Sequence, residues 1–221
     1  MFRKEIAYYF STPIAYIVIG LYLLAVSLFL WVIPGQWNII DSGYAQTDGL
    51  FQLSPWLMML LCPALTMRLF AEERQTGTWD MLIVQPISIT RIVAAKFLAA
   101  WTLMLIALLP NIVHYFIVYA IAEPIGNIDG GQFAGSFIGL VFLSGTFLAI
   151  GVLAGSTTKS HIVAYILGAL ACFVLYWLIL QHFYTAVSRG VIDLTDGLVF
   201  VAIGLTCLVG AVLILTKLSH R

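Results

Sequence analysis

The side chains in this sequence that could do chemistry are few, and they are densest between residues 72 and 82. Four charged residues fall within nine positions: Glu72, Glu73, Arg74 and Asp80. Charged side chains fix the orientation of a protein contact, and Trp79 and Leu82 add the apolar surface that stabilises one. A solvated loop is the simpler interpretation of such a run. An apolar patch rimmed by charge nevertheless favours docking to another protein.

A glycine corner follows the first charges. Gly77 interrupts the helical pattern and predicts a helix end, and Thr78 has the side chain of an N-cap for the next turn. We therefore expect a short charged helix, a corner at Gly77, a second short helix over residues 78–84 and a break at Pro86.

The spacing of a catalytic or metal site is not found elsewhere in the sequence. The segment 151–160 comes closest to a phosphate-binding P-loop, but it lacks the adjacent Gly-Lys pair and follows a predicted helix instead of a strand. The cysteines, Cys62, Cys172 and Cys207, lie in apolar runs without a CxxC spacing. The sequence thus predicts no catalytic residue, no metal site and no cofactor.

Two polar side chains lie near the middle of an apolar stretch. Asn111 and His114 are three residues apart and share one helix face, and Pro110 beside them predicts a kink. A hydrogen bond between helices is the simpler use of this pair, and lining of a translocation path is the alternative. The four histidines could in principle ligate haem, but His114 has no obvious partner at matching depth.

The composition of the chain predicts the surroundings in which these residues lie. Of the 221 residues, 62% are hydrophobic and 9% are charged, and the net charge is zero. A soluble domain has about 25% charged residues, so this chain has too little polar surface to be a soluble enzyme. A neutral chain also lacks the basic surface that nucleic-acid binding requires. The expected surroundings are therefore a lipid bilayer.

Long charge-free runs predict how the chain crosses that bilayer. A hydrocarbon core of roughly 30 Å takes about 20 helical residues, and unpaired backbone groups are not tolerated in lipid. Six runs are long enough, at about 14–33, 54–70, 97–121, 133–155, 162–181 and 197–216. We therefore predict an all-α membrane protein in which residues 1–221 form a single transmembrane domain with six spanning helices.

The first twelve residues predict a separate amphipathic helix that lies along the membrane surface. Its apolar face consists of Phe2, Ile6, Tyr9 and Phe10. Anchoring of the N-terminus and contact with a partner are both open as its role. With six spans, nine of the ten basic residues fall on the same side of the membrane as this helix, and Arg189 alone falls on the opposite side. The positive-inside rule therefore predicts that both termini are cytoplasmic.

Small residues recur at four-residue intervals in two of the predicted spans. Gly151 and Gly155 lie in the fourth, and Ala164, Gly168 and Cys172 lie in the fifth. Such stripes allow helices to approach closely, within the subunit or, less expectedly, across a dimer interface.

Three stretches of the sequence carry a resemblance to a known family. The run FAEERQTGT at residues 70–78, with Leu82, Pro86 and Lys96 after it, resembles the coupling-helix region of ABC-2 type permeases. The opening RKEIAYYFSTPIAYIV is similar to that family's N-terminal helix and first span, and HFYTAVSRGVID is similar to the stretch between its last two spans. The resemblance is closest to the gliding-motility-associated ABC transporter permeases, with the permease of the nitrous-oxide-reductase maturation system a near relative.

The resemblance implies the membrane half of an ATP-driven transporter in a bacterial inner membrane. ATP would be bound by a separate ATPase subunit, and a second permease subunit, identical or different, would complete a dimer mostly through spans one and five. The resemblance places the contact with the ATPase at Glu72, Glu73, Arg74, Gly77, Thr78, Trp79, Asp80 and Leu82. Arg189 and Asp193 would belong to an outer gate. The family is mostly export-oriented, so we expect an exporter.

A second function class stays open on the residues alone. The alternative to a transporter permease is a membrane anchor, or a haem- or quinone-binding subunit of a redox complex. An absorption spectrum distinguishes the two classes, because a haem gives a Soret band.

Overall fold

The computed structural model of the chain describes residues 2–79, 88–181, 184 and 194–219. These residues form helices, and none of them belongs to a strand. In chain order the elements are α1 (Phe2–Ser11), α2 (Pro13–Trp31), α3 (Ile39–Ser42), α4 (Asp48–Gln75), α6 (Ile89–Leu108), α7 (Asn111–Ile121), α8 (Gly130–Thr157), α9 (His161–Leu175), the π-helix η1 (Tyr176–Leu180) and α11 (Leu194–Ser219).

Six of these helical segments are long and apolar enough to cross a membrane. They are α2, α4, the α6–α7 pair, α8, α9 with the start of η1, and α11. The predicted fold class, an all-α membrane protein with six spanning helices, is confirmed. The predicted kink in the third span is also present, because α6 ends at Leu108 and α7 begins at Asn111, with Pro110 between them.

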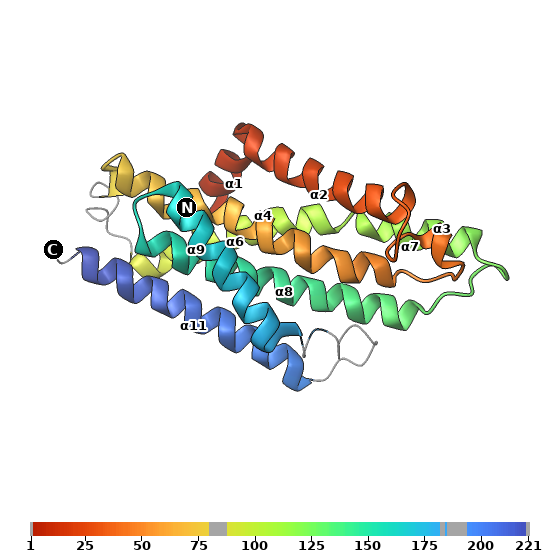
Figure 1. The fold of residues 1–221 in the computed structure, drawn as a ribbon. Helices are drawn as coiled ribbons and strands as arrows, with labels where there is room; N and C mark the ends of the chain where they lie inside the picture. Colours follow the sequence, from red (N-terminus) through yellow and green to blue (C-terminus); the bar gives the residue numbers. More distant parts are fainter. Residues whose placement is uncertain (1, 80–87, 182–183, 185–193, 220–221) are drawn as a thin grey trace.

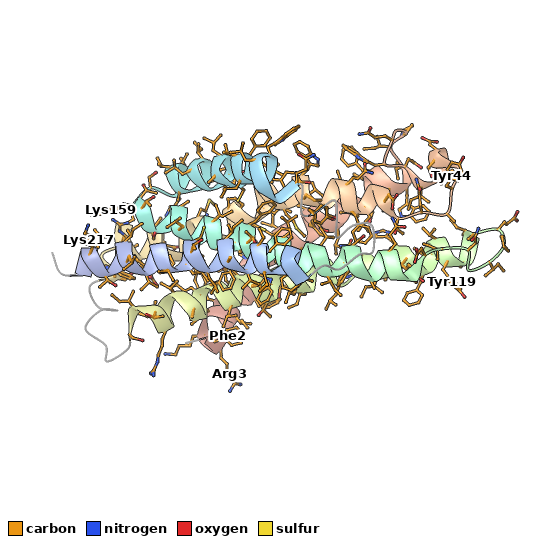
Figure 2. The ribbon with its side chains drawn as sticks, turned by 90° about the horizontal axis from the view of Figure 1, so that it is seen from below. Phe2, Arg3, Tyr44, Tyr119, Lys159 and Lys217 are labelled. Carbon is orange, nitrogen blue, oxygen red and sulfur yellow. The ribbon has the colours of Figure 1, made fainter. Side chains whose placement is uncertain are left out.

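The two ends of the helix bundle differ in their residues. Figure 1 shows α1 and the last turns of α11 toward one end, and α3 and the end of α7 at the other. Figure 2 shows Lys159 and Lys217 at the first end and Tyr44 and Tyr119 at the second. We call these the α1 end and the α3 end.

The centre of the bundle is formed by α4 and α8. These two helices contact each other along their length, and α9 and α11 pack against α8 (Figure 1). In the apolar part of α4 and of α8, 67% of the residues are buried, against 17% in α11. The outer helices therefore present most of their apolar side chains to lipid or to another chain.

Small residues bring the central helices close together. A Cβ atom on Gly151 would overlap Thr66 Oγ1, and one on Gly155 would lie 3.3 Å from the Thr66 carbonyl oxygen. A Cβ on Gly168 would lie 3.1 Å from Pro63 Cβ. These three glycines therefore pack against α4 of the same chain, as the simpler interpretation of the stripes predicted.

Helix starts and ends follow local capping rules. Pro13 occupies the first turn of α2, where its missing N–H costs nothing. The Asn38 side chain accepts hydrogen bonds from two amides at the start of α3, and the Asp129 side chain does the same for α8. These caps lie at the α3 end and fix where α3 and α8 begin.

Candidate functional site

The charged residues at the end of α4 belong to one continuous helix. The span predicted at 54–70 continues without a break to Gln75, so the expected short charged helix is the last part of α4. The corner at Gly77 is confirmed, since its φ of +73° is left-handed and favours glycine. Residues Thr78 and Trp79 are helical, and the rest of the expected helix over 78–84 lies outside the described residues.

An ion triad joins α4 to α1 and α6. Lys96 Nζ lies 2.7 Å from Glu73 Oε1 and 3.2 Å from Glu5 Oε1. The lysine is only 4% exposed and also lies 5.5 Å from the centre of the Phe70 ring. A buried ammonium group is costly unless it is paired, so these contacts hold three helices together at one point.

Two tyrosines of α1 add to this attachment. The Tyr9 hydroxyl donates a hydrogen bond of 3.1 Å to the Leu65 carbonyl oxygen, and the Tyr8 hydroxyl lies 3.5 Å from Glu72 Oε2. Burial raises the pKa of Tyr9 far above its usual value, so it remains a donor. The pKa of Tyr8 is raised by burial and by the Glu72 charge. Helix α1 is therefore anchored to α4 as well as to α6.

Arg74 connects the end of α4 to the turn between α8 and α9. Its Nη1 donates a hydrogen bond of 2.7 Å to the Ser156 carbonyl oxygen and lies 3.4 Å from the Thr158 carbonyl oxygen. These carbonyl groups belong to the C-terminal end of α8, where they have no partner within the helix. A cation is favoured there by the helix dipole. The end of α4 is thus bonded to α6 through the Glu73–Lys96 pair and to the turn between α8 and α9 through Arg74.

The corner itself is held by local hydrogen bonds. The Thr76 amide donates to the Glu72 carbonyl oxygen at 2.9 Å, and the hydroxyls of Thr76 and Thr78 lie 2.9 Å apart. Residues Gln75 to Thr78 are exposed, whereas Glu73 and Arg74 are partly buried. The corner is therefore more exposed to another protein than the charged side chains before it.

The expectation that Trp79 adds exposed apolar surface is wrong. Its side chain is 6% exposed and packs edge-on against Phe70, with ring centres 6.1 Å apart. Asp80 and Leu82 lie outside the described residues. The Trp79 side chain therefore packs on α4, and the exposed residues of the corner include Gln75 and Thr76, which sequence analysis missed.

The missed residues had weak signals in the sequence. Gln75 and Thr76 directly precede the glycine that ends the helix, a position that is exposed whenever a helix ends in a turn. Glu5 lies near the start of an amphipathic helix without any local partner. Its pairing with Lys96, far away in the sequence, required the tertiary structure.

A groove of about 470 Å³ lies beside the triad, between α1 and α4. Its lining contains charges of both signs, among them Lys4, Arg68, Glu72 and Glu73. Such a mixed lining suits a polar protein contact better than the binding of a single anion or cation.

Asn111 and His114 make hydrogen bonds between helices. Asn111 Nδ2 donates to the Tyr22 hydroxyl oxygen at 3.0 Å, and that hydroxyl lies 3.0 Å from Ser54 Oγ. Trp31 Nε1 donates to His114 Nδ1 at 3.0 Å. These bonds link α7 to α2 and α4, as the simpler interpretation of the polar pair predicted. The residues proposed for an outer gate, Arg189 and Asp193, lie outside the described residues.

Comparison with known proteins agrees with this architecture. The family model described as ABC-2 family transporter protein matches residues 35–209, which is most of the chain and includes all of α4, α6, α7, α8 and α9. A search of curated proteins finds no match. Members of this family are membrane components of transporters, generally distinct from the ATPase that works with them. The chain therefore belongs to the ABC-2 family of transporter proteins.

Proposed function

We propose that this chain is the permease subunit of an ATP-driven exporter and that a separate ABC ATPase drives it through the corner at residues 75–78. The observation that carries the proposal is the position of the α4 end. Glu73 pairs with Lys96 of α6, which also pairs with Glu5 of α1, and Arg74 is bonded to the α8–α9 turn. A displacement of the corner is therefore transmitted to most of the bundle at once.

The proposed contact divides the predicted coupling residues into two roles. Gly77 and Thr78 lie at the exposed corner and would touch the ATPase, together with Gln75 and Thr76. Glu72, Glu73, Arg74 and Trp79 would position that corner from within the chain. Asp80 and Leu82 are proposed to extend the contact.

The α1 end is proposed to face the cytoplasm of a bacterial cell, with the chain in the inner membrane. The distribution of basic residues supports this orientation, because arginine and lysine concentrate on the cytoplasmic side of membrane proteins. Lys159 and Lys217 lie at that end in Figure 2. An ATPase can meet the corner only on this side, where ATP is available.

A second permease subunit is proposed to pack against α2 and α9. Both helices carry rows of exposed large apolar side chains, including Ile17 and Leu21 on α2 and Ile166 and Leu170 on α9. The resemblance to ABC-2 permeases supports this choice, since that family pairs mostly through the first and fifth spans.

The same resemblance supports membership of the gliding-motility-associated subgroup and export as the direction. Asn111 and His114 are proposed to pack the bundle beside any path and Arg189 and Asp193 to form part of an outer gate.

Purification of the tagged chain from its native membranes tests the proposal. We expect a P-loop ATPase to co-purify, and the complex in lipid nanodiscs to hydrolyse ATP. Thr76→Trp should lower both the amount of bound ATPase and the hydrolysis rate, because the bulky side chain obstructs the exposed corner. Arg91→Trp, also an exposed position near the α1 end, serves as the matched control. A haem Soret band without any bound ATPase would contradict the proposal and favour a redox subunit.

A further inference from the structure

A cavity of about 710 Å³ opens in the half of the bundle toward the α3 end, away from the charge cluster. Its walls come from the segment before α3, the first turns of α4 and α8, and the end of the fifth span at η1. The size is within the range of pockets that enclose a small molecule. The residues that line it have a composition unlike the rest of the chain.

The described part of the fifth span is shorter than its neighbours beside the cavity. Helices α4 and α8 have 28 residues each, whereas α9 has 15 and η1 adds 5. Figures 1 and 2 both show that α9 reaches less far toward the α3 end than α8 does. The described wall at this point is the π-helix η1, a rare conformation that is often found at functional sites.

Side-chain amides dominate the polar part of the lining. Four of the seven glutamines in the sequence line the cavity, and they come from four separate segments: Gln36, Gln52, Gln132 and Gln181. An amide can donate and accept hydrogen bonds at once, which suits it to hydroxyl groups. Gathering amides from distant segments at one place in a chain with so few polar residues indicates a recognition surface.

Aromatic rings supply the apolar part. Trp37, Trp56 and Trp177 line the cavity and make up half of the six tryptophans in the sequence. Tryptophan and tyrosine present a flat apolar face, and the C–H face of a sugar ring packs well against it. Trp56 and Trp177 are 43% and 55% exposed, so their surfaces are open to a ligand.

The charges of the lining narrow the class of ligand. Among the described residues of the lining none is lysine or arginine, so none of them would neutralise an anion. The one carboxylate among these described residues is Asp48, and its Oδ1 already accepts a hydrogen bond of 2.9 Å from Gln132 Nε2. A quaternary ammonium group could pack against the aromatic rings, but it makes no hydrogen bonds and would leave the four amides without a partner. The described lining therefore best suits a group that has both an apolar face and hydroxyl groups.

We propose that this cavity binds an uncharged, hydroxyl-rich group, such as a pyranose ring. The ring would stack on the tryptophan faces while its hydroxyls pair with the glutamine amides. A free saccharide and the sugar headgroup of a glycolipid would present the same chemistry. The role of the cavity as an outward-facing substrate site rests on the proposed function, whereas binding itself is a property of this chain alone.

Tryptophan fluorescence of the full chain in nanodiscs tests the binding. One arm titrates the protein with glucose, N-acetylglucosamine and lactose, and the other uses nanodiscs with increasing fractions of a monoglucosyl diacylglycerol. Glucose 6-phosphate and choline serve as the charged counterparts. We expect a saturable fluorescence change in at least one arm, with weaker binding or none for the two charged compounds. A response in the lipid arm alone would assign the ligand to a glycolipid headgroup.

Two variants at exposed positions of the lining identify the cavity as the source of the signal. Gln52→Ala and Trp177→Ala should each weaken binding roughly fivefold, since Gln52→Ala removes hydrogen bonds and Trp177→Ala removes a stacking surface, each a loss of about 1 kcal/mol. Trp101→Phe is the matched control, because Trp101 lies outside this cavity and should leave the affinity unchanged. An unchanged melting temperature shows that the variants remain folded.

Several results would overturn the inference. They are the absence of saturation in both arms, equal or tighter binding of choline or glucose 6-phosphate, and unchanged affinity in the two cavity variants. These outcomes are separate from failure of the proposed function, because capture of the ATPase and ATP hydrolysis do not require an occupied cavity.

Discussion

Glu73 Oε1 lies 2.7 Å from Lys96 Nζ, which joins the last turns of the second span to the start of the third. The two residues are 23 positions apart in the sequence and lie on opposite sides of the proposed ATPase contact. Because the pair is partly buried and Glu5 of α1 shares the lysine, the acidic residue that sequence analysis assigned to a partner is engaged within its own chain. Its expected role is to transmit movement, not to receive the ATPase.

Replacing the shared lysine should weaken the attachment of α1 to the bundle, where Tyr9 would remain bonded to Leu65. Lys96→Met leaves two partly buried carboxylates without their cation, so the cost should approach but not exceed the roughly 3 to 5 kcal/mol of breaking a fully buried pair. We expect a clearly lower melting temperature in nanodiscs and loss of ATPase stimulation. Arg91→Met, on the exposed face of the same helix, should change neither quantity. Equal melting temperatures for the two variants would show that the triad is not stabilising.

Loss of Arg74 should loosen the turn between α8 and α9. Arg74→Ala removes the hydrogen bonds to two carbonyl groups at the end of α8, and charged hydrogen bonds contribute about 1.5 to 3 kcal/mol. The exposed Lys159 in that turn should then be cleaved faster by trypsin. Arg68→Ala, at an exposed position of α4, is the control. Cleavage at the wild-type rate would argue against Arg74 as the link.

At Gly77 the space for a side chain is available, but the left-handed backbone conformation disfavours any residue other than glycine. A Cβ on Gly77 would meet no atom within 4 Å, so the cost of Gly77→Ala comes only from its φ of +73° and should be about 1 to 2 kcal/mol. Gly77→Val should cost more, since a β-branched residue is stiffer, and should reduce ATP-driven transport. Gly20 in α2 also has open space but no left-handed φ, so Gly20→Ala should be neutral or slightly stabilising.

Close approach of α4 and α8 should make Gly151 sensitive to a single methyl group. The Cβ of Gly151→Ala would overlap Thr66 Oγ1, so the helices must shift, and overpacking of this kind costs about 1 to 3 kcal/mol. The double variant Gly151→Ala/Thr66→Ala should recover part of the lost melting temperature. Gly204→Ala, where the nearest atom is 3.9 Å away, should have little effect. A lack of any recovery in the double variant would place the clash elsewhere.

A double-mutant cycle should reveal the role of Asn111. Asn111→Ala and Tyr22→Phe each remove one side of a 3.0 Å hydrogen bond between α7 and α2. Hydrogen bonds between membrane helices contribute about 0.6 kcal/mol on average, so we expect a coupling energy of that order in unfolding measurements. If transport falls sharply in Asn111→Ala while stability is unchanged, Asn111 lines the path and the packing role is wrong.

The architecture could be predicted from the sequence because lipid restricts the backbone to few choices. Long runs without charge must become spanning helices, and the single proline at position 110 marked the kink in the third of them. The left-handed corner at Gly77 was also predictable, since few residues other than glycine adopt that conformation. The π-helix at Tyr176–Leu180 had no signal, because its hydrogen-bond register is not encoded in hydrophobicity.

The sequence by itself determined the fold class, the spans and the place where the charges gather. Only the tertiary structure decided what those charges contact. It turned Glu73 toward Lys96 and Arg74 toward Ser156, buried Trp79 on Phe70, and left Gln75 to Thr78 at the surface. The physical reason is that a spanning helix is predicted from the hydrophobicity of consecutive residues. An ion pair between helices instead depends on which helices lie side by side. That arrangement is set by packing between segments far apart in the chain.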